Sequence, residues 1–345
     1  MHRGIVGATI VLAAAAPCAL EAQGGERFVL EGTRAAVYNL AGAVRVEAGT
    51  GSDVVVEVTR GGGDGRDLRV RVDDGVLAVT YPGDQIVYPA AGRGSSSQTT
   101  VRDDGTFGGD RGRGGRRVRI AGSGSGREAW ADLRVLVPAG RTVSVHQAVG
   151  RVELTNVSGD LRVDGLAASI RSQGTRGSLT LDTGSGSIEV RDAEGEVELD
   201  TGSGGVRMTD VDARHLTVDT GSGGVTGRGI RADMLKVDVG SGGVRLDQVA
   251  ARDILVDTGS GSVGLSLTAD AERVRIDTGS GGVTLSVPSN FGAALEIDTG
   301  SGGIAVDVPV TARRASRSSL RGTVGDGRGT VIIDTGSGGV RIRGS

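Results

Sequence analysis

The phrase Asp200-Thr-Gly-Ser-Gly-Gly205 decides the fold of this chain, because near-copies of it recur at almost constant spacing through the C-terminal half. The gaps between successive copies are 18, 19, 19, 19, 20, 21 and 36 residues, so the last gap is about two periods. A fixed period of this length with an internal turn signal predicts a solenoid, in which each repeat buries its apolar face only by stacking on its neighbours. The copies begin at Asp182, Asp200, Asp219, Asp238 (with Val239 in place of Thr), Asp257, Asp277, Asp298 and Asp334.

Short alternating runs flank each phrase, such as Val197-Glu-Leu199 before a turn and Val206-Arg-Met208 after one. A period of two with β-branched residues indicates strands. We therefore expect an all-β fold, a parallel β-solenoid resembling a right-handed β-helix, with about 19 residues per coil. Single apolar residues in several loops break the alternation, and we expect them to turn inward as a short third side: Val211, Ile230, Val249 and Leu267.

The turn chemistry leaves two interpretations open. Its glycines are expected to supply positive φ and close approach between coils, whereas stacked aspartates would repel by about 1 kcal/mol per pair in water. In the favoured interpretation Asp and the next Thr or Ser cap the turn by accepting backbone N–H bonds, with outward arginines such as Arg207, Arg245 and Arg341 nearby. The alternative is a column of Ca²⁺ sites, although in Gly-Asp-rich calcium rolls the Asp follows the glycines. Its candidate ligands are Asp182, Asp200, Asp219, Asp238, Asp257, Asp277 and Asp298.

The first 22 residues have the pattern of an export signal. His2 and Arg3 precede an apolar stretch, and Ala22 is a small residue suited to cleavage. The only cysteine, Cys18, lies inside this segment, and Pro17 before it fits a lipoprotein motif poorly. We expect a mature chain without a transmembrane segment, located in the periplasm, on the outer surface or outside the cell.

The remaining chain divides into three parts. Residues 23–81 are expected to form N-terminal β coils that cap the stack, and residues 129–345 the β-solenoid repeat domain. Between them, residues 82–128 are rich in Gly, Arg and Ser and are expected to be a disordered insert. Residues 311–329 are expected to form one degenerate coil, and the final Val340-Arg-Ile-Arg343 to blunt the open edge of the stack with outward charges.

Composition and motifs point away from catalysis. A net charge of −3 disfavours nucleic acid as a partner, and aromatic residues make up 2% of the chain. The three histidines, His2, His146 and His215, are far apart, and the sequence has no nucleophile elbow, phosphate loop or His-Glu-x-x-His motif. We therefore expect no catalytic residues and no cofactor, so the chain is not expected to be an enzyme.

The stretch Leu136-Val-Pro-Ala-Gly140, followed by Asn156-Val-Ser-Gly-Asp160 and then by the repeated phrase, resembles the bacterial "putative adhesin" β-strand-repeat family. The resemblance covers roughly residues 130–345. It implies an exported, non-enzymatic, adhesin-like structural or interaction protein of the cell envelope, whose partner would be an envelope or surface protein or a polysaccharide. The alternative is a Ca-binding or glycan-active β-helix module.

Overall fold

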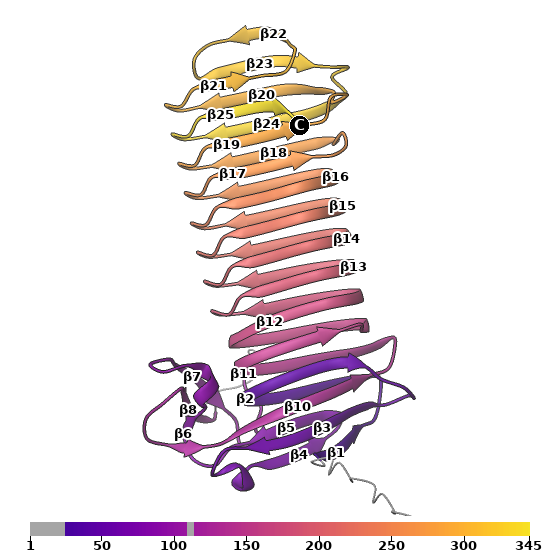
Figure 1. The fold of residues 1–345 in the computed structure, drawn as a ribbon, viewed down its shortest axis with the longest axis vertical. Helices are drawn as coiled ribbons and strands as arrows, with labels where there is room; N and C mark the ends of the chain where they lie inside the picture. Colours follow the sequence, from indigo (N-terminus) through magenta and orange to yellow (C-terminus); the bar gives the residue numbers. More distant parts are fainter. Residues whose placement is uncertain (1–24, 109–113) are drawn as a thin grey trace, which may run out of the picture.

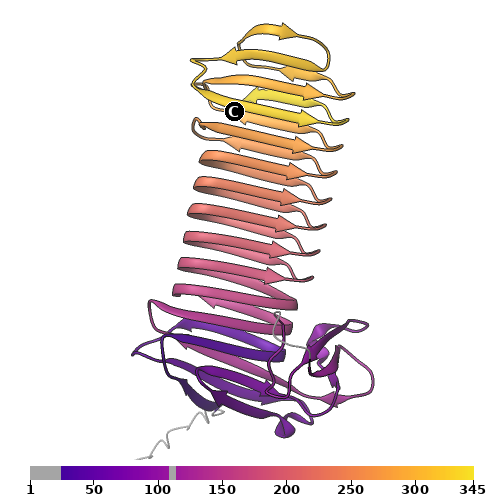
Figure 2. The same cartoon turned by 180° about the vertical axis from the view of Figure 1, so that it is seen from behind.

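The computed structural model describes residues 25–108 and 114–345, which form a tall stack of β coils with a smaller sheet beside its base (Figures 1 and 2). The stack is one 21-stranded sheet, and the smaller sheet has four strands. The predicted all-β parallel solenoid is confirmed. The predicted export signal, residues 1–22, and its Cys18 lie outside the described residues. Within the described ranges, no helix has the length and apolar character needed to cross a membrane.

The middle of the stack consists of long strands that each wind around a coil and pair in parallel with the next. Partners are 18 residues apart at Ile188 and Val206, and 19 apart at Asp200 and Asp219. The change occurs where the register shifts after Gly195 and leaves Arg214 as the added residue. The predicted period of about 19 is thus confirmed. The strands are β12 (Ser158–Thr183), β13 (Ile188–Thr201), β14 (Val206–Thr220), β15 (Val225–Val239) and β16 (Val244–Thr258).

A corner divides each of these strands where the alternation breaks. The predicted inward residues Val211, Ile230, Val249 and Leu267 are all buried, with at most 2% of their surface exposed, so the short third side is confirmed. The residue before the inward position adopts a left-handed conformation in six successive coils. Asn, Asp and Gly tolerate that conformation best. These corner residues are Asn156, Gly174, Asp192, Asp210, Gly229 and Gln248, with φ between 50° and 67°.

The turn glycines are required for only one of the two predicted reasons, the close approach between coils. Gly202 and Gly204 do not have a left-handed φ, so the expected positive φ is wrong at these positions. Close approach is the cause that remains, because a Cβ on Gly204 would overlap the carbonyl oxygen of Gly186 in the preceding coil. The sixth position is different: a Cβ on Gly205 would lie 3.4 Å from its nearest neighbour, the carbonyl oxygen of Gly224. Two copies of the phrase carry Ser187 and Ser262 there.

At the base, the order of strands in the stack departs from their order in the chain. Strand β2 lies between β10 and β11, with Val44 opposite both Leu133 and Val152. The antiparallel strands β1 and β3 and the hairpin β4–β5 complete this end. The elements are β1 (Glu26–Leu30), β2 (Arg34–Ala48), β3 (Val54–Gly61), the short helix η1 (Gly65–Asp67), β4 (Arg69–Asp73), β5 (Val76–Thr80), β10 (Trp130–Val137) and β11 (Arg141–Thr155).

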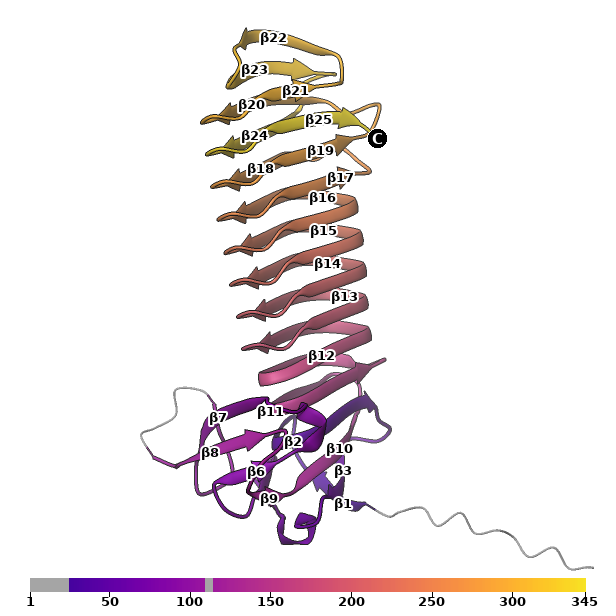
Figure 3. The same cartoon turned by 60° about the vertical axis from the view of Figure 1, so that its left-hand side comes forward.

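The insert, residues 82–128, was expected to be disordered, and for its described part this prediction is wrong. Strand β8 pairs with both β6 and β7, and β6 also pairs with β9 (Figure 3). Val118 and Ile120 are buried, and Val101 and Phe107 join the same apolar cluster. These few apolar residues are enough to order the segment because it packs against the base of the stack. Its elements are β6 (Gln85–Val87), η2 (Pro89–Ala91), β7 (Ser96–Val101), β8 (Arg116–Ala121) and β9 (Arg127–Glu128).

The far end also departs from chain order, and here two predictions are wrong. Residues 311–329 do not form a degenerate coil: most of them belong to an antiparallel hairpin, β22–β23, that covers the last coil. The C-terminal strands do not form the open edge, because β24 lies between β18 and β20 (Figure 1). The strands of this end are β17 (Val263–Leu267), β18 (Arg273–Thr278), β19 (Val283–Val287), β20 (Ala293–Thr299), β21 (Ile304–Val306), β22 (Val310–Ala315), β23 (Ser319–Val324), β24 (Gly329–Thr335) and β25 (Val340–Gly344).

Candidate functional site

The aspartates of the repeated phrase form one outward column along the stack, which we call the aspartate column. Partial burial, followed by the charges of neighbouring aspartates, raises the pKa of Asp200 and Asp257 above the ordinary value of 3.8. The column is therefore a line of mutual repulsion in the middle of the stack. In spatial order its members are Asp164, Asp182, Asp200, Asp219, Asp238, Asp257, Asp277, Asp334 and Asp298.

Threonine, rather than aspartate, caps the turns. The Thr201 hydroxyl donates to the carbonyl oxygen of Gly186 in the preceding coil, at 2.9 Å, and accepts from the backbone N–H of Gly204, at 3.0 Å. Equivalent pairs of bonds are made by Thr220, Thr258 and Thr278. These hydroxyls are buried, and we call their series the threonine column. The prediction that Asp caps the turn is wrong.

The arginines expected to offset the aspartate column do not pair with it. Arg245 pairs with Asp247 at 3.1 Å, and Arg341 with Asp307 at 3.8 Å. Arg207 is exposed on β14 and forms no ion pair among the described residues. The charges of Arg162 and Arg275 do lower the pKa of individual column members, but each is outweighed by burial and by aspartate repulsion.

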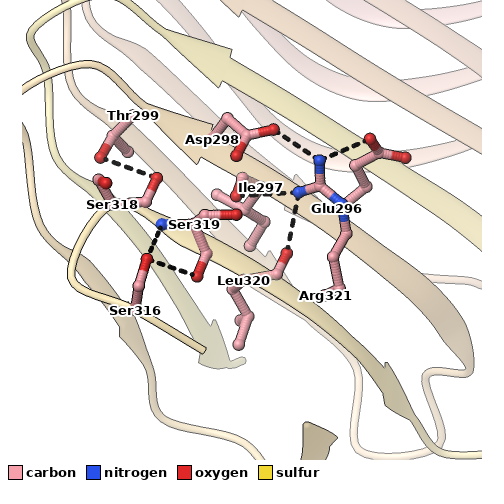
Figure 4. A network of polar contacts seen from close by, with 9 residues as sticks. All are labelled: Glu296, Ile297, Asp298, Thr299, Ser316, Ser318, Ser319, Leu320 and Arg321. Carbon is pink, nitrogen blue, oxygen red and sulfur yellow. Dashed lines mark hydrogen bonds and ion pairs between the residues drawn. The ribbon is translucent and has the colours of Figure 1, made fainter. Parts of the chain in front are cut away.

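The far end of the column is closed by Arg321, which the hairpin β22–β23 places beside the last aspartate (Figure 4). Its guanidinium donates to Asp298 at 2.7 Å and lies equally close to Glu296. Hydrogen bonds from Arg321 and Ser319 lower the pKa of Asp298, in contrast to the raised values in the middle.

The near end of the column is closed by a histidine. His146 occupies the position preceding Asp164 in the same register, and its Nδ1 lies 3.3 Å from the Oδ2 of Asp164. This bond lowers the pKa of Asp164. The next position is Tyr38, whose ring stacks on the imidazole with centroids 4.2 Å apart and planes 4° apart. A basic side chain therefore closes the aspartate column at each end.

A cleft of about 660 Å³ opens at this histidine end, and we call it the N-terminal cleft. Three segments that are far apart in the sequence meet there: the column end on β2, β11 and β12, the hairpin β4–β5, and the loop after β7. Aromatic rings and charges of both signs converge in it, which is typical of a ligand-binding site. Its lining includes Tyr38, Arg71, Asp73, Asp74, Val76, Ala78, Arg102, Asp104, Thr106, Phe107, Gly108, His146, Arg162 and Asp164.

The loop that forms one wall of the N-terminal cleft is held by its own polar groups. Asp104 accepts hydrogen bonds from the backbone N–H of Thr106 at 2.9 Å and from its hydroxyl at 2.7 Å, and both bonds lower its pKa. Arg102 donates to Thr106 and to the carbonyl oxygen of Gly108. Phe107 is 5% exposed and meets the Tyr38 ring edge to face at 5.7 Å. The wall is therefore preformed.

A buried polar network lies behind the cleft, around Asn39, the inward-pointing residue that follows Tyr38 on β2. Asn39 donates to Gln147 at 3.0 Å and to the carbonyl oxygen of Ala131 at 2.9 Å, and it accepts from the Tyr81 hydroxyl at 2.7 Å. Burial raises the pKa of Tyr81, so this phenol stays protonated as a donor. Asn39 and Gln147 are register partners at the inward position that threonine takes in later coils.

A larger hollow of about 920 Å³ lies across the outward face of the upper coils. Glycine, serine, threonine and valine contribute most of its lining, which contains no aromatic residue. It is a shallow depression where outward side chains are small, as at Gly264 and Ser266. Its charged lining residues are Arg245, Asp247, Arg341 and Arg343, and no ring lies among them. Because the N-terminal cleft, unlike this hollow, combines charges of both signs with aromatic rings, it is the better candidate site.

The residues singled out from the sequence are only partly brought together. The seven candidate calcium ligands lie in one column, one carboxylate per coil, and within the described ranges no group of three or more His, Cys, Asp and Glu side chains is arranged to hold a metal ion. His215 is exposed on β14, far along the stack from His146. His2 lies outside the described residues.

Sequence reasoning missed the N-terminal cleft, although two signals pointed to it. Of the seven aromatic residues, six lie between Phe28 and Trp130, in a region that carries few copies of the repeat idiom. Tyr38-Asn39 and His146-Gln147 also precede glycines at equal spacing, Gly42 and Gly150, as Asp-Thr precedes glycine in the repeat. Both pairs are divergent copies of the phrase in which the outward aspartate is replaced by a ring.

Comparisons with known proteins place the chain in a family but give little on function. No curated protein matches it. A solved structure of a "putative cell adhesion protein" from Clostridium sporogenes aligns with 93% of this chain and 98% of its own, at 12% identity and a TM-score of 0.19, which is too weak to bear on fold or function. The family model described as Toastrack DUF4097 matches residues 171–343, half of the chain, and the chain therefore belongs to the Toastrack family.

Proposed function

We propose that this chain is an exported, non-enzymatic, adhesin-like interaction protein of the bacterial cell envelope, and that its N-terminal cleft receives the partner. The observation that carries the proposal is the convergence of the Tyr38, His146 and Phe107 rings with arginines and aspartates at the end of the aspartate column where rings replace the outward aspartate. The solenoid serves as a rigid support that holds this end away from its other end.

The chemistry of the cleft fits a polysaccharide better than a purely ionic ligand. Arg71 and Arg162 are exposed cations in the lining, and Asp73 and Asp74 are exposed anions beside them. Side chains of both signs bind hydroxyl groups as donors and acceptors, and together they leave no strong net charge that would select a polyanion. A surface polysaccharide is therefore the first partner to test, and an envelope protein the second.

The binding test compares the full chain with a double variant in the cleft and a single variant far from it. Isothermal titration with surface polysaccharide of the producing bacterium should show binding that the double change Arg71→Ala and Arg162→Ala weakens at least tenfold, the effect expected for two lost charge-assisted hydrogen bonds of about 1–2 kcal/mol each. Arg207→Ala removes an exposed arginine far from the cleft and should leave the affinity unchanged. Equal affinities for all three proteins would exclude the cleft as the binding site.

Export has its own test. Mass spectrometry of the protein recovered from the envelope or medium should show an N-terminus at Gln23, the product of cleavage after Ala22. An intact N-terminus on protein that stays in the cytoplasm would contradict the proposal at this point, without affecting the binding result.

The calcium alternative is separated by thermal unfolding. We expect the same melting temperature in excess EGTA and in millimolar Ca²⁺, because the proposed role uses no resident ion. A large upward shift with Ca²⁺ would replace this proposal with that of a calcium-binding module, since a ligand that binds only the folded state stabilises it.

A further inference from the structure

A second groove lies between the insert and the outward face of the base, and it shares no lining residue with the N-terminal cleft. Its volume is about 320 Å³, within the usual range for a small-molecule site. Segment η2 forms one wall, and outward side chains of β2, β10 and β11 form the rest. We call it the tryptophan groove, and its principal residues are Ala43, Arg45, Tyr88, Trp130, Asp132 and Arg151.

The floor of the tryptophan groove is Ala43, a small residue between two longer ones on neighbouring strands. Arg151 is its register partner on β11. On β10, the Oδ1 of Asp132 accepts a hydrogen bond from the Ala43 N–H at 2.8 Å. Because neighbouring levels are ~4.8 Å apart, the backbone positions of Arg151 and Asp132 are about 10 Å apart. A guanidinium and a carboxylate therefore flank a methyl group, with the width of one sugar ring between them.

Two aromatic rings meet in this groove. The rings of Trp130 and Tyr88 have centroids 5.8 Å apart and planes at 53°. The indole is held from behind by the backbone of Gly61, where a Cβ would overlap its Nε1 atom. Among the described residues, the Tyr88 hydroxyl has no hydrogen-bond partner, although Tyr88 is only 7% exposed. Burial raises the pKa of Tyr88, so the hydroxyl remains a protonated donor. A buried phenol usually has a partner, and here a ligand in the groove can supply one.

The two arginines of the groove also have unused donors. Arg45 and Arg151 both approach Glu153, at 3.6 and 3.9 Å, which is beyond hydrogen-bonding distance. Their side chains are 54% and 56% exposed. Asp132 uses one carboxylate oxygen for the Ala43 N–H, so the other can accept from a hydroxyl. The groove therefore offers two guanidinium groups to a carboxylate and one carboxylate to hydroxyl groups.

We propose that the tryptophan groove binds a sugar that carries a carboxylate, a uronic acid unit of a polysaccharide. The sugar carboxylate accepts from Arg45 and Arg151. The ring lies over Ala43 against the Trp130 indole, and a ring hydroxyl donates to Asp132. A neutral sugar leaves the guanidinium groups without an acceptor, and a simple anion leaves the indole uncovered, so both bind more weakly. This site is independent of the proposed export and of the N-terminal cleft.

The test uses the fluorescence of Trp130, the one tryptophan of the chain, so the signal reports on this groove alone. The full chain is titrated with D-glucuronate, D-galacturonate and D-mannuronate, and in parallel with the neutral sugars D-glucose, D-galactose and D-mannose and with acetate. We expect a saturating change of emission with at least one uronic acid, at a dissociation constant of about 1 mM or below. Its neutral counterpart and acetate should each bind at least about tenfold more weakly.

Two double variants separate this groove from the N-terminal cleft. Arg45→Gln with Arg151→Gln should weaken the fluorescence-detected binding at least about tenfold, because the carboxylate loses both guanidinium donors. Arg71→Ala with Arg162→Ala changes the N-terminal cleft and should leave the response of Trp130 unchanged, whatever it does to polysaccharide binding there.

The proposal is wrong if no uronic acid changes the emission of the unmodified chain, or if the neutral sugars or acetate bind as tightly as the acids. It is also wrong if the variant with Arg45→Gln and Arg151→Gln binds as tightly as the unmodified chain. The comparison of acidic with neutral sugars needs no variant, so it decides the question even if a substitution disturbs the fold.

Discussion

The middle of the stack and its two ends use the same coil but assemble it differently. From β13 to β16 each strand lies between its predecessor and its successor in the chain. At the base β2 lies between two later strands, and at the far end β24 lies between two earlier ones. Strand β2 and the strand pair β24–β25 are thus enclosed within the stack, and antiparallel strands cover the outermost coils. The difference shows that an edge of the stack needs a dedicated seal, whereas the middle does not.

The same two regions treat an identical aspartate in opposite ways. Asp257 in the middle has a raised pKa because of burial and its aspartate neighbours, and Asp298 at the end has a lowered pKa because Arg321 donates to it. Asp164 at the other end is likewise lowered by His146. Each repeat therefore adds a carboxylate to a column in which neighbouring carboxylates repel one another. Only at the two ends does a basic side chain bond to the aspartate and offset this repulsion.

The largest effect is expected at the closest contact in the middle coils. Gly204→Ala should lower the stability by about 2–3 kcal/mol, because its Cβ would overlap the Gly186 carbonyl oxygen and force the coils apart. Gly205→Ala, one residue later, should change it by less than ~0.5 kcal/mol. Thermal melting of both variants measures the difference, and equal melting temperatures would show that close approach does not determine the turn.

The threonine column should give the next largest effect. Thr220→Val removes a hydroxyl that donates to Gly204 and accepts from Gly223, and it should cost about 1–3 kcal/mol by leaving buried backbone groups unpaired. Val239 is the natural gap in this column, so Val239→Thr should stabilise the protein by about 1 kcal/mol. Denaturant midpoints test both, and a loss of stability on adding the hydroxyl would contradict the capping role.

Removing the charge of one column aspartate should change the stability by less than the two preceding variants do. The change should have opposite signs in the middle and at the end of the column. Asp257→Asn should raise the stability and Asp298→Asn should lower it, each by less than about 1 kcal/mol because both groups are near the surface. The matched pair tests whether the end compensates for the column. Shifts of the same sign in both variants would mean that it does not.

The pH dependence of these two variants should be the smallest and most specific signal. The raised pKa of Asp257 means that its cost to folding is complete at neutral pH and disappears as the pH falls below the ordinary value of 3.8. The lowered pKa of Asp298 means that its contribution is complete above 3.8 and is lost only as the pH falls further, through the folded value. Urea titrations from pH 7 to pH 3 should therefore show the Asp257→Asn gain disappearing at higher pH than the Asp298→Asn loss.

Much of the coil was predictable because its causes are local. Alternation gave the strand faces, and the break of alternation at Val211 and Ile230 correctly placed a third side. The role of Asp in the turn was predicted wrongly because a carboxylate and a neighbouring hydroxyl can both accept backbone N–H bonds, so the sequence predicted that both residues cap the turn. Only the inward direction of Thr201, toward the coil before it, decides between them.

The N-terminal cleft was less accessible to prediction because its walls come from three separate segments. Phe107 lies in a stretch whose composition suggests disorder, and its order depends on packing against Tyr38 on the base of the stack. Composition describes what a segment can bury within itself, and it does not describe what a neighbouring surface offers.

By itself, the sequence determined the period, the inward and outward faces and the turn of each coil, since these depend on residues a few positions apart. The tertiary structure alone decided the order of the coils at both ends and the small sheet of the insert. It also decided the N-terminal cleft, which lies between the base of the stack and the insert. The physical reason is that every coil presents nearly the same edge to its neighbours, so local chemistry cannot distinguish one neighbour from another. The choice is made by chain connections, by the need to cover the open edges, and by single side chains such as Arg321 and His146 that end the aspartate column.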